Sequence, residues 1–233
     1  MSSVIAMGGT IFLYLYWPSF NAVWAAPENQ LRIIVNTALA ISASCIGAFT
    51  LARLVCMKAD MEIALSATLA GGVAMGACCD SLLSPGIAIG IGAFAGVVSA
   101  YCRAYLTSAI HKLGLHDTCG VLNVHGIPGI IGAFASAITT ANADLTFPKA
   151  GQNLDSVFGG WMANRQYTFQ GATQIFALLI SIAIGFLSGA FSGLVASWVG
   201  RTPKQLFEDE EHWHGAEYEQ PYVNKVYNRV ETP

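Results

Sequence analysis

The stretch ATQIFALLISIAIGFLSGAFSGLVASWV, residues 172–199, contains no Asp, Glu, Lys or Arg. The hydrocarbon core of a bilayer is about 30 Å thick, so an α-helix needs roughly 20 consecutive apolar residues to cross it. This stretch meets that requirement, and it is too long for the core helix of a small soluble domain. It therefore predicts a transmembrane helix.

The composition of the whole chain fits the same environment. Of the 233 residues, 54% are hydrophobic and only 11% are charged, whereas soluble domains carry about 25% charged residues. These proportions exclude a soluble, disordered or coiled-coil protein. A formal net charge of −3 argues against a nucleic-acid partner. We interpret the chain as an integral membrane protein that contacts membrane lipid.

Other apolar stretches predict five more helices, so the expected fold is an all-α membrane protein with about six transmembrane helices. The expected spans are residues 3–24, 32–55, 61–79, 86–108, 118–140 and 172–199. The third and fifth are weakly apolar and rich in small residues, so we expect them to face protein or a pore rather than lipid. We expect residues 1–200 to form the transmembrane domain and residues 201–233 a solvated cytoplasmic tail.

The basic residues of the short loops predict the orientation. Cytoplasmic loops carry an excess of Lys and Arg. The basic residues on one side of the predicted topology are Arg53, Lys58, Arg103, Lys112, Arg201 and Lys204. Those on the opposite side are fewer: Arg32, Lys149 and Arg165. We therefore place both termini in the cytoplasm, and the expected location of this multi-pass protein is the plasma membrane.

Polar residues in the fifth span mark a candidate site. Asp117 precedes the apolar run, where a carboxylate can accept hydrogen bonds from the free N–H groups of a helix start. His125 lies about 12 Å deeper at the helical rise of 1.5 Å per residue. An imidazole at that depth is costly and faces a cavity or a polar partner. His125 is therefore either a pore residue or a buried histidine bonded to a backbone carbonyl. Pro128 has no N–H and leaves a backbone carbonyl of this helix unbonded, which favours a position beside a pore.

Aromatic residues close the first span, which ends in YWPSFN at residues 16–21. By the predicted orientation this end of the span is extracellular, and aromatic side chains at the end of a span commonly anchor a helix at the membrane interface. Phe20 can alternatively close the mouth of a pore or hold a cation over its ring face. From the residues alone, both roles for Phe20 stay open.

Three segments in fixed order resemble the signatures of one family. The longest is LHDTCGVLNVHGIPGIIG at residues 115–132, and the others are YWPSFN at 16–21 and ATLAGGVA at 67–74. Together they resemble the Rh glycoproteins, the animal branch of the Amt/Rh ammonium transporter family. The resemblance covers residues 3–215 and corresponds to the second half of the family's fold of eleven or twelve helices.

The resemblance implies a role for each candidate residue. His125 would be one of two stacked pore histidines, and Phe20 one of two phenylalanines at the outer mouth. Asp117 would lie at the cytoplasmic end of the pore helix, and Asn123, in the same motif, is a further expected pore residue. The second histidine and the second phenylalanine belong to the first half of the family fold, which this chain does not match.

The resemblance also implies a channel rather than an enzyme. Desolvating ammonium is costly, so a narrow apolar pore lined by histidine would conduct neutral ammonia and reject ions. The implied partners are ammonia or ammonium, with carbon dioxide as a second gas, and a homotrimer or an assembly with full-length Rh subunits. The alternative is a truncated, non-conducting Rh-like subunit with a structural or regulatory role. No cofactor or metal is expected, because Cys78 and Cys79 lack the spaced partners of a zinc site.

Overall fold

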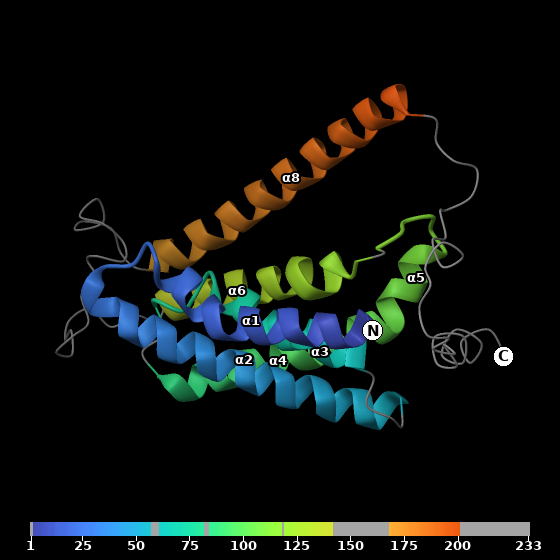
Figure 1. The fold of residues 1–233 in the computed structure, drawn as a ribbon. Coiled ribbons are helices and arrows are strands. Elements are labelled where there is room, and N and C mark those ends of the chain that lie inside the picture. Colours follow the sequence, from blue (N-terminus) through green and yellow to red (C-terminus); the bar gives the residue numbers. More distant parts are fainter. Residues whose placement is uncertain (1, 57–60, 82–83, 118, 142–167, 201–233) are drawn as a thin grey trace.

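A computed structural model describes residues 2–56, 61–81, 84–117, 119–141 and 168–200, and the described part of the chain is helical (Figure 1). Its elements are α1 (Ser2–Ala22), α2 (Pro27–Cys56), α3 (Met61–Met75), α4 (Pro85–Tyr101), the π-helical turn η1 (Cys102–Leu106), α5 (Thr107–His111), the π-helical turn η2 (Leu122–Gly126), α6 (Ile127–Ala141) and α8 (Thr168–Val199). The predicted tail, residues 201–233, lies outside the described residues.

These elements form long helical runs that correspond to the predicted spans. Four are long and apolar enough to cross a membrane by length and composition: Pro27–Val55, Pro85–His111, Leu122–Ala141 and Gln170–Val199. The apolar part of α3 is shorter, Leu65–Met75, and α1 occupies the first predicted span. The prediction of an all-α membrane protein is confirmed.

The helix ends differ from the predicted spans by a few residues. The helix α2 begins at Pro27 rather than at residue 32, because proline is well suited to the first turn of a helix, where its missing N–H is not needed. The helix α3 ends at Met75 rather than at residue 79, and α8 begins at Thr168 rather than at residue 172. A prediction from hydropathy leaves out the polar first turns of α2 and α8. It also includes the apolar residues after α3, which are not helical.

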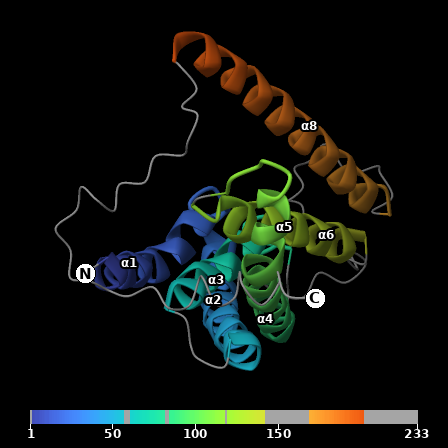
Figure 2. The same ribbon diagram turned by 90° about the vertical axis from the view of Figure 1, so that its right-hand side faces the viewer.

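The helix α3 lies in the middle of the bundle, with α1 on one side and α6 on the other, and α2 and α4 pack against α3 and against each other (Figure 2). Small residues bring these backbones together. A Cβ atom added to Gly96 of α4 would lie 2.2 Å from the carbonyl oxygen of Ser44 in α2. Ser44 also donates from its hydroxyl to the carbonyl of Ala67 at 2.5 Å. Ala67, Ala70 and other residues of α3 are almost fully buried, so this helix faces protein, one of the two environments predicted for it.

The helix α8 stands apart from this bundle. Its first turn is held close to α6, because a Cβ atom added to Gly171 would lie 2.7 Å from the carbonyl oxygen of Ala137. Beyond that point α8 runs diagonally away from the other helices (Figures 1 and 2). Its apolar window is 0% buried. Gly185, Gly189 and Gly193 have no atom of the described residues within 4 Å of an added Cβ.

Candidate functional site

The imidazole of His125 is exposed and lies against an indole. His125 belongs to η2, the turn that leads into α6, and Trp17 belongs to α1. The two ring centroids are 6.4 Å apart and the ring planes are inclined by 23°, a stacked arrangement. Among the described residues, the imidazole has no hydrogen-bond partner. This placement differs from that of a buried histidine bonded to a backbone carbonyl.

The position of Trp17 depends on a glycine of the neighbouring helix α3. A Cβ atom added to Gly72 would lie 2.8 Å from Nε1 of Trp17 and 2.9 Å from its Cδ1. The end of α1 is also anchored by Asn21, whose side-chain amide donates to Oγ1 of Thr37 at 3.2 Å and to the carbonyl of Gly72 at 3.3 Å. In the sequence, Trp17 is one of a group of aromatic residues at the end of the first span, and no pattern joins it to His125.

Phe20 lies three residues beyond Trp17 on α1 and is 58% exposed. Residues three apart on a helix are neighbours on its surface, so Phe20 and Trp17 share a side of α1. The structure therefore brings His125 together with Trp17, and it places Phe20 one turn along the same helix.

Asp117 accepts hydrogen bonds from the start of the following helix. Its Oδ1 accepts from the backbone N–H of Val121 at 2.8 Å, and its Oδ2 accepts from that of Leu122 at 3.0 Å. The chain turns between them at Gly120, which has a φ of +68°. This left-handed φ favours glycine, whereas the 2.8 Å between an added Cβ and Nη1 of Arg103 would be relieved by a movement of the flexible arginine side chain. Both carboxylate oxygens are thus used to cap the helix that carries His125.

Two segments near His125, η1 and η2, have π-helical rather than α-helical hydrogen bonding. In η2 the N–H of Ile127 donates to the carbonyl of Leu122, and in η1 the N–H of Thr107 donates to the carbonyl of Cys102. Each bond spans five residues instead of the four of an α-helix. Pro128 follows η2 and has no N–H to donate in the α-helical pattern. Single π-helical turns inside α-helices are frequently found at functional sites.

Asn123 lies behind this surface, with only 1% of the residue exposed. Its Nδ2 donates to Oγ1 of Thr107 at 2.8 Å. Its Oδ1 is buried and has no hydrogen-bond partner among the described residues. The prediction that Asn123 is a pore residue stays a prediction, and its geometry is that of a residue packed between the two π-helical turns.

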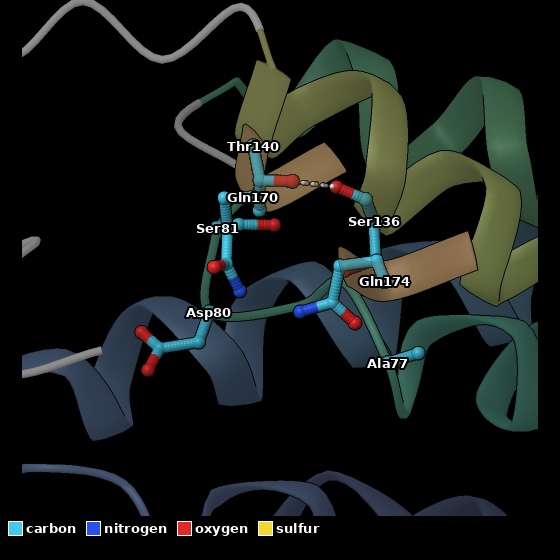
Figure 3. A pocket seen from close by; sticks show the side chains of 7 residues that line it. All are labelled: Ala77, Asp80, Ser81, Ser136, Thr140, Gln170 and Gln174. Carbon is cyan, nitrogen blue, oxygen red and sulfur yellow. Dashed lines mark hydrogen bonds between the residues drawn. The ribbon is translucent and has the colours of Figure 1, made fainter. Parts of the chain in front are cut away.

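A polar pocket of about 300 Å³ lies at the opposite end of α6 (Figure 3). The lining residues are Ala77, Asp80, Ser81, Ser136, Thr140, Gln170 and Gln174. Asp80 pairs with Arg32, with 3.0 Å between Oδ1 and Nη2. None of the residues predicted as site residues lines this pocket. No group of three or more His, Cys, Asp or Glu suited to a metal ion occurs in the part of the chain that the structure describes.

Comparisons with known proteins place the fold and the motif in a class of membrane transport proteins. The sequence profile of the Ammonium Transporter Family matches residues 1–218. The chain belongs to the ammonium transporter family, and it is similar to the Rh-type members.

The chain is 36% identical over 234 residues to the ammonium transporter Rh type C of Rattus norvegicus, a match that covers 97% of this chain and 46% of the relative. It is also 36% identical to the Homo sapiens protein of the same name over 220 residues, or 91% of this chain and 46% of the relative. The chain thus spans about half the length of these curated relatives.

The fold is similar to that of Rh50 of Nitrosomonas europaea, from a study of conduction by the Rhesus family of channels. The TM-score is 0.71 at 26% identity, and the match covers 99% of this chain and 53% of that chain. A sensor Amt protein is similar in fold, with a TM-score of 0.54 at 24% identity over 76% of this chain and 44% of that chain. The predicted resemblance to part of an Rh-type protein is confirmed.

Proposed function

We propose that this chain forms part of an Rh-type channel that conducts neutral ammonia along a path passing His125. Membership of the ammonium transporter family supports ammonia or ammonium as the substrate. The single observation that carries the choice of site is the exposed imidazole of His125, stacked on Trp17 and free of hydrogen-bond partners within the described residues.

The chemistry of these two rings suits an uncharged solute. A neutral imidazole offers one donor and one acceptor, so His125 can hydrogen-bond ammonia without fixing a charge. The indole of Trp17 adds an apolar wall on the other side. An ammonium ion entering the same place would lose its hydration, which is costly in apolar surroundings. The ion would therefore release its proton to water at the outer mouth before it reaches His125, and ammonia would take up a proton from water beyond the path.

The other candidate residues take positions along this path in the proposal. Phe20, exposed on α1, would lie at the outer mouth. Asp117 would hold the cytoplasmic end of the pore helix through its two bonds to backbone N–H groups. The proposal places both termini in the cytoplasm, the protein in the plasma membrane and the assembly as a homotrimer, with carbon dioxide as a second gas. It includes no covalent step and no cofactor.

The side of the path opposite His125 would come from residues outside this chain. Two observations support this part of the proposal. Exposed aromatic and aliphatic side chains cover α1, including Ile11, Phe12 and Phe20, and the matched relatives are about twice as long. The same open side also favours the second candidate function, a non-conducting subunit that packs against full-length Rh proteins.

Ammonia flux distinguishes the two candidates. Proteoliposomes would contain this chain alone, this chain with the complementary half of an Rh type C relative, or the complementary half alone. Stopped-flow recording of internal pH would report ammonia entry. The channel proposal expects flux above the lipid background only when both parts are present. A stable assembly of the two parts that conducts no more than lipid would reject the channel and favour the structural subunit.

A further inference from the structure

A side-chain hydrogen bond joins η2 to the residue that directly follows η1. It runs from Nδ2 of Asn123 in η2 to Oγ1 of Thr107, the residue that follows η1, and measures 2.8 Å. The Thr107 hydroxyl donates in turn to the carbonyl of Cys102 at 3.5 Å, so its oxygen is left to accept from Asn123. Thr107 and Asn123 therefore connect the run that contains α4 and α5 with the run that contains α6.

The position of this bond bears on the direction of His125. A π-helical turn winds less per residue than an α-helix, whose residues each turn the chain by about 100°, so residues two apart in η2 point to roughly opposite sides. With the Asn123 side chain held inward at 1% exposure, the side chain two positions later must point outward. That is where the structure places the imidazole of His125, against Trp17.

Because η2 is a π-helical turn, its rotation has to be held by a contact with another part of the chain. A π-helical turn contains one extra residue and is rare compared with an α-helical turn. If η2 relaxed to the α-helical pattern, residues on its two sides would rotate relative to each other by about 100°, the turn of one residue. A buried carboxamide resists this rotation, since leaving its partner would strand a polar group away from water.

We propose that Asn123 is a positioning residue, whose bond to Thr107 fixes the rotation of η2 and thereby holds the His125 imidazole against the Trp17 indole. The relevance of this placement for transport rests on the proposed function, in which His125 lies on the ammonia path. The placement itself does not depend on conduction and is measured without ammonia.

Trp17 provides the readout. In a background with Trp24, Trp161, Trp198 and Trp213 replaced by Phe, Trp17 is the remaining tryptophan of the chain. The imidazole lies beside the indole, with 6.4 Å between the ring centroids, and a protonated imidazole this near quenches the indole emission. We expect the emission of the folded protein to change with pH in one step, and we expect His125→Ala to remove that step.

Variants that remove the hydrogen bond between Asn123 and Thr107 then test the proposed role of Asn123. We expect Asn123→Ala and Thr107→Val each to reduce the amplitude of the step at least twofold, and their combination to reduce it no further than the stronger single change. Thr107→Ser keeps the hydroxyl and should retain the step. A full step in folded Asn123→Ala or Thr107→Val protein would overturn the proposal, as would a parent protein with no His125-dependent step. If Asn123→Ala does not fold, the amplitude of the step in Thr107→Val is compared with that in Thr107→Ser, and a smaller step in Thr107→Val supports the proposal. Absence of ammonia flux would count against the proposed function and would leave this result unchanged.

Discussion

Replacing His125 by alanine separates a pore residue from a structural one. The imidazole is exposed and has no hydrogen-bond partner among the described residues, so its removal strands no buried group. We expect the free energy of unfolding to change by no more than about 0.5 kcal/mol, as for most exposed positions. A buried histidine bonded to a carbonyl would instead cost about 1–3 kcal/mol, because its partner would be left unpaired.

The expected effect on transport follows from the one hydrogen bond that His125 would lend to ammonia. Such a bond contributes about 0.5–1.5 kcal/mol net, which corresponds to roughly a two- to tenfold loss of ammonia flux. His125→Asp should have a different result, because an anion on the path would attract cations and admit an ammonium current. His111→Ala, which removes an exposed histidine at the end of α5, is the matched control and should change neither quantity.

Three measurements on the same variants decide the outcome. Thermal unfolding in detergent gives the stability of the variants, and stopped-flow flux in proteoliposomes that also hold the complementary half gives transport per folded protein. Electrical recording gives the ammonium current. If His125→Ala and His125→Asp conduct like the parent and His125→Ala unfolds far more easily, the imidazole is a structural group and the site assignment is wrong.

Three further changes test the geometry around this site. Asp117→Ala should destabilise the chain by about 0.5–2 kcal/mol through loss of the helix cap, with a smaller effect for Asp117→Asn, as measured by thermal unfolding. Gly96→Ala should lower stability by about 1–3 kcal/mol, because the backbones of α2 and α4 must separate, whereas Gly90→Ala in the open part of α4 should not; equal midpoints for the two would refute this packing. Gly72→Ala should shift the Trp17 indole, which lies 2.8 Å from the new Cβ, and alter ammonia flux with a smaller loss of stability than Gly96→Ala; unaltered flux would argue against a role for Trp17 in the path.

The sequence predicts those features whose causes lie close together along the chain. Helices such as α8 are recognisable because a charge-free run of sufficient length has one stable form in a bilayer. The bonds from Asp117 to the N–H groups of Val121 and Leu122 are likewise foreseeable, since donor and acceptor lie within one turn. Family resemblance adds His125 and Phe20 as candidates, although flux remains the measurement that assigns their roles.

The features that sequence analysis missed depend on contacts between distant segments. Whether a turn adopts the π-helical or the α-helical pattern depends on a small difference in energy. For η2 that difference is influenced by the bond from Asn123 to Thr107, which belongs to another helical run. The stacking of His125 on Trp17 joins residues from the beginning and the middle of the chain. No periodicity or spacing encodes either contact.

The exposed surfaces of α8 and of the His125 region have different physical consequences. Apolar side chains such as those of α8 can face lipid at little cost, so their exposure does not require a protein partner. The imidazole of His125 is an exposed polar group in a helical run that is apolar on average, and facing hydrocarbon would be costly for it. The side formed by α1 and η2 must therefore meet protein or a water-filled path, whereas the outer side of α8 need not. For this reason we expect the complementary wall of the channel to cover His125, Trp17 and Phe20.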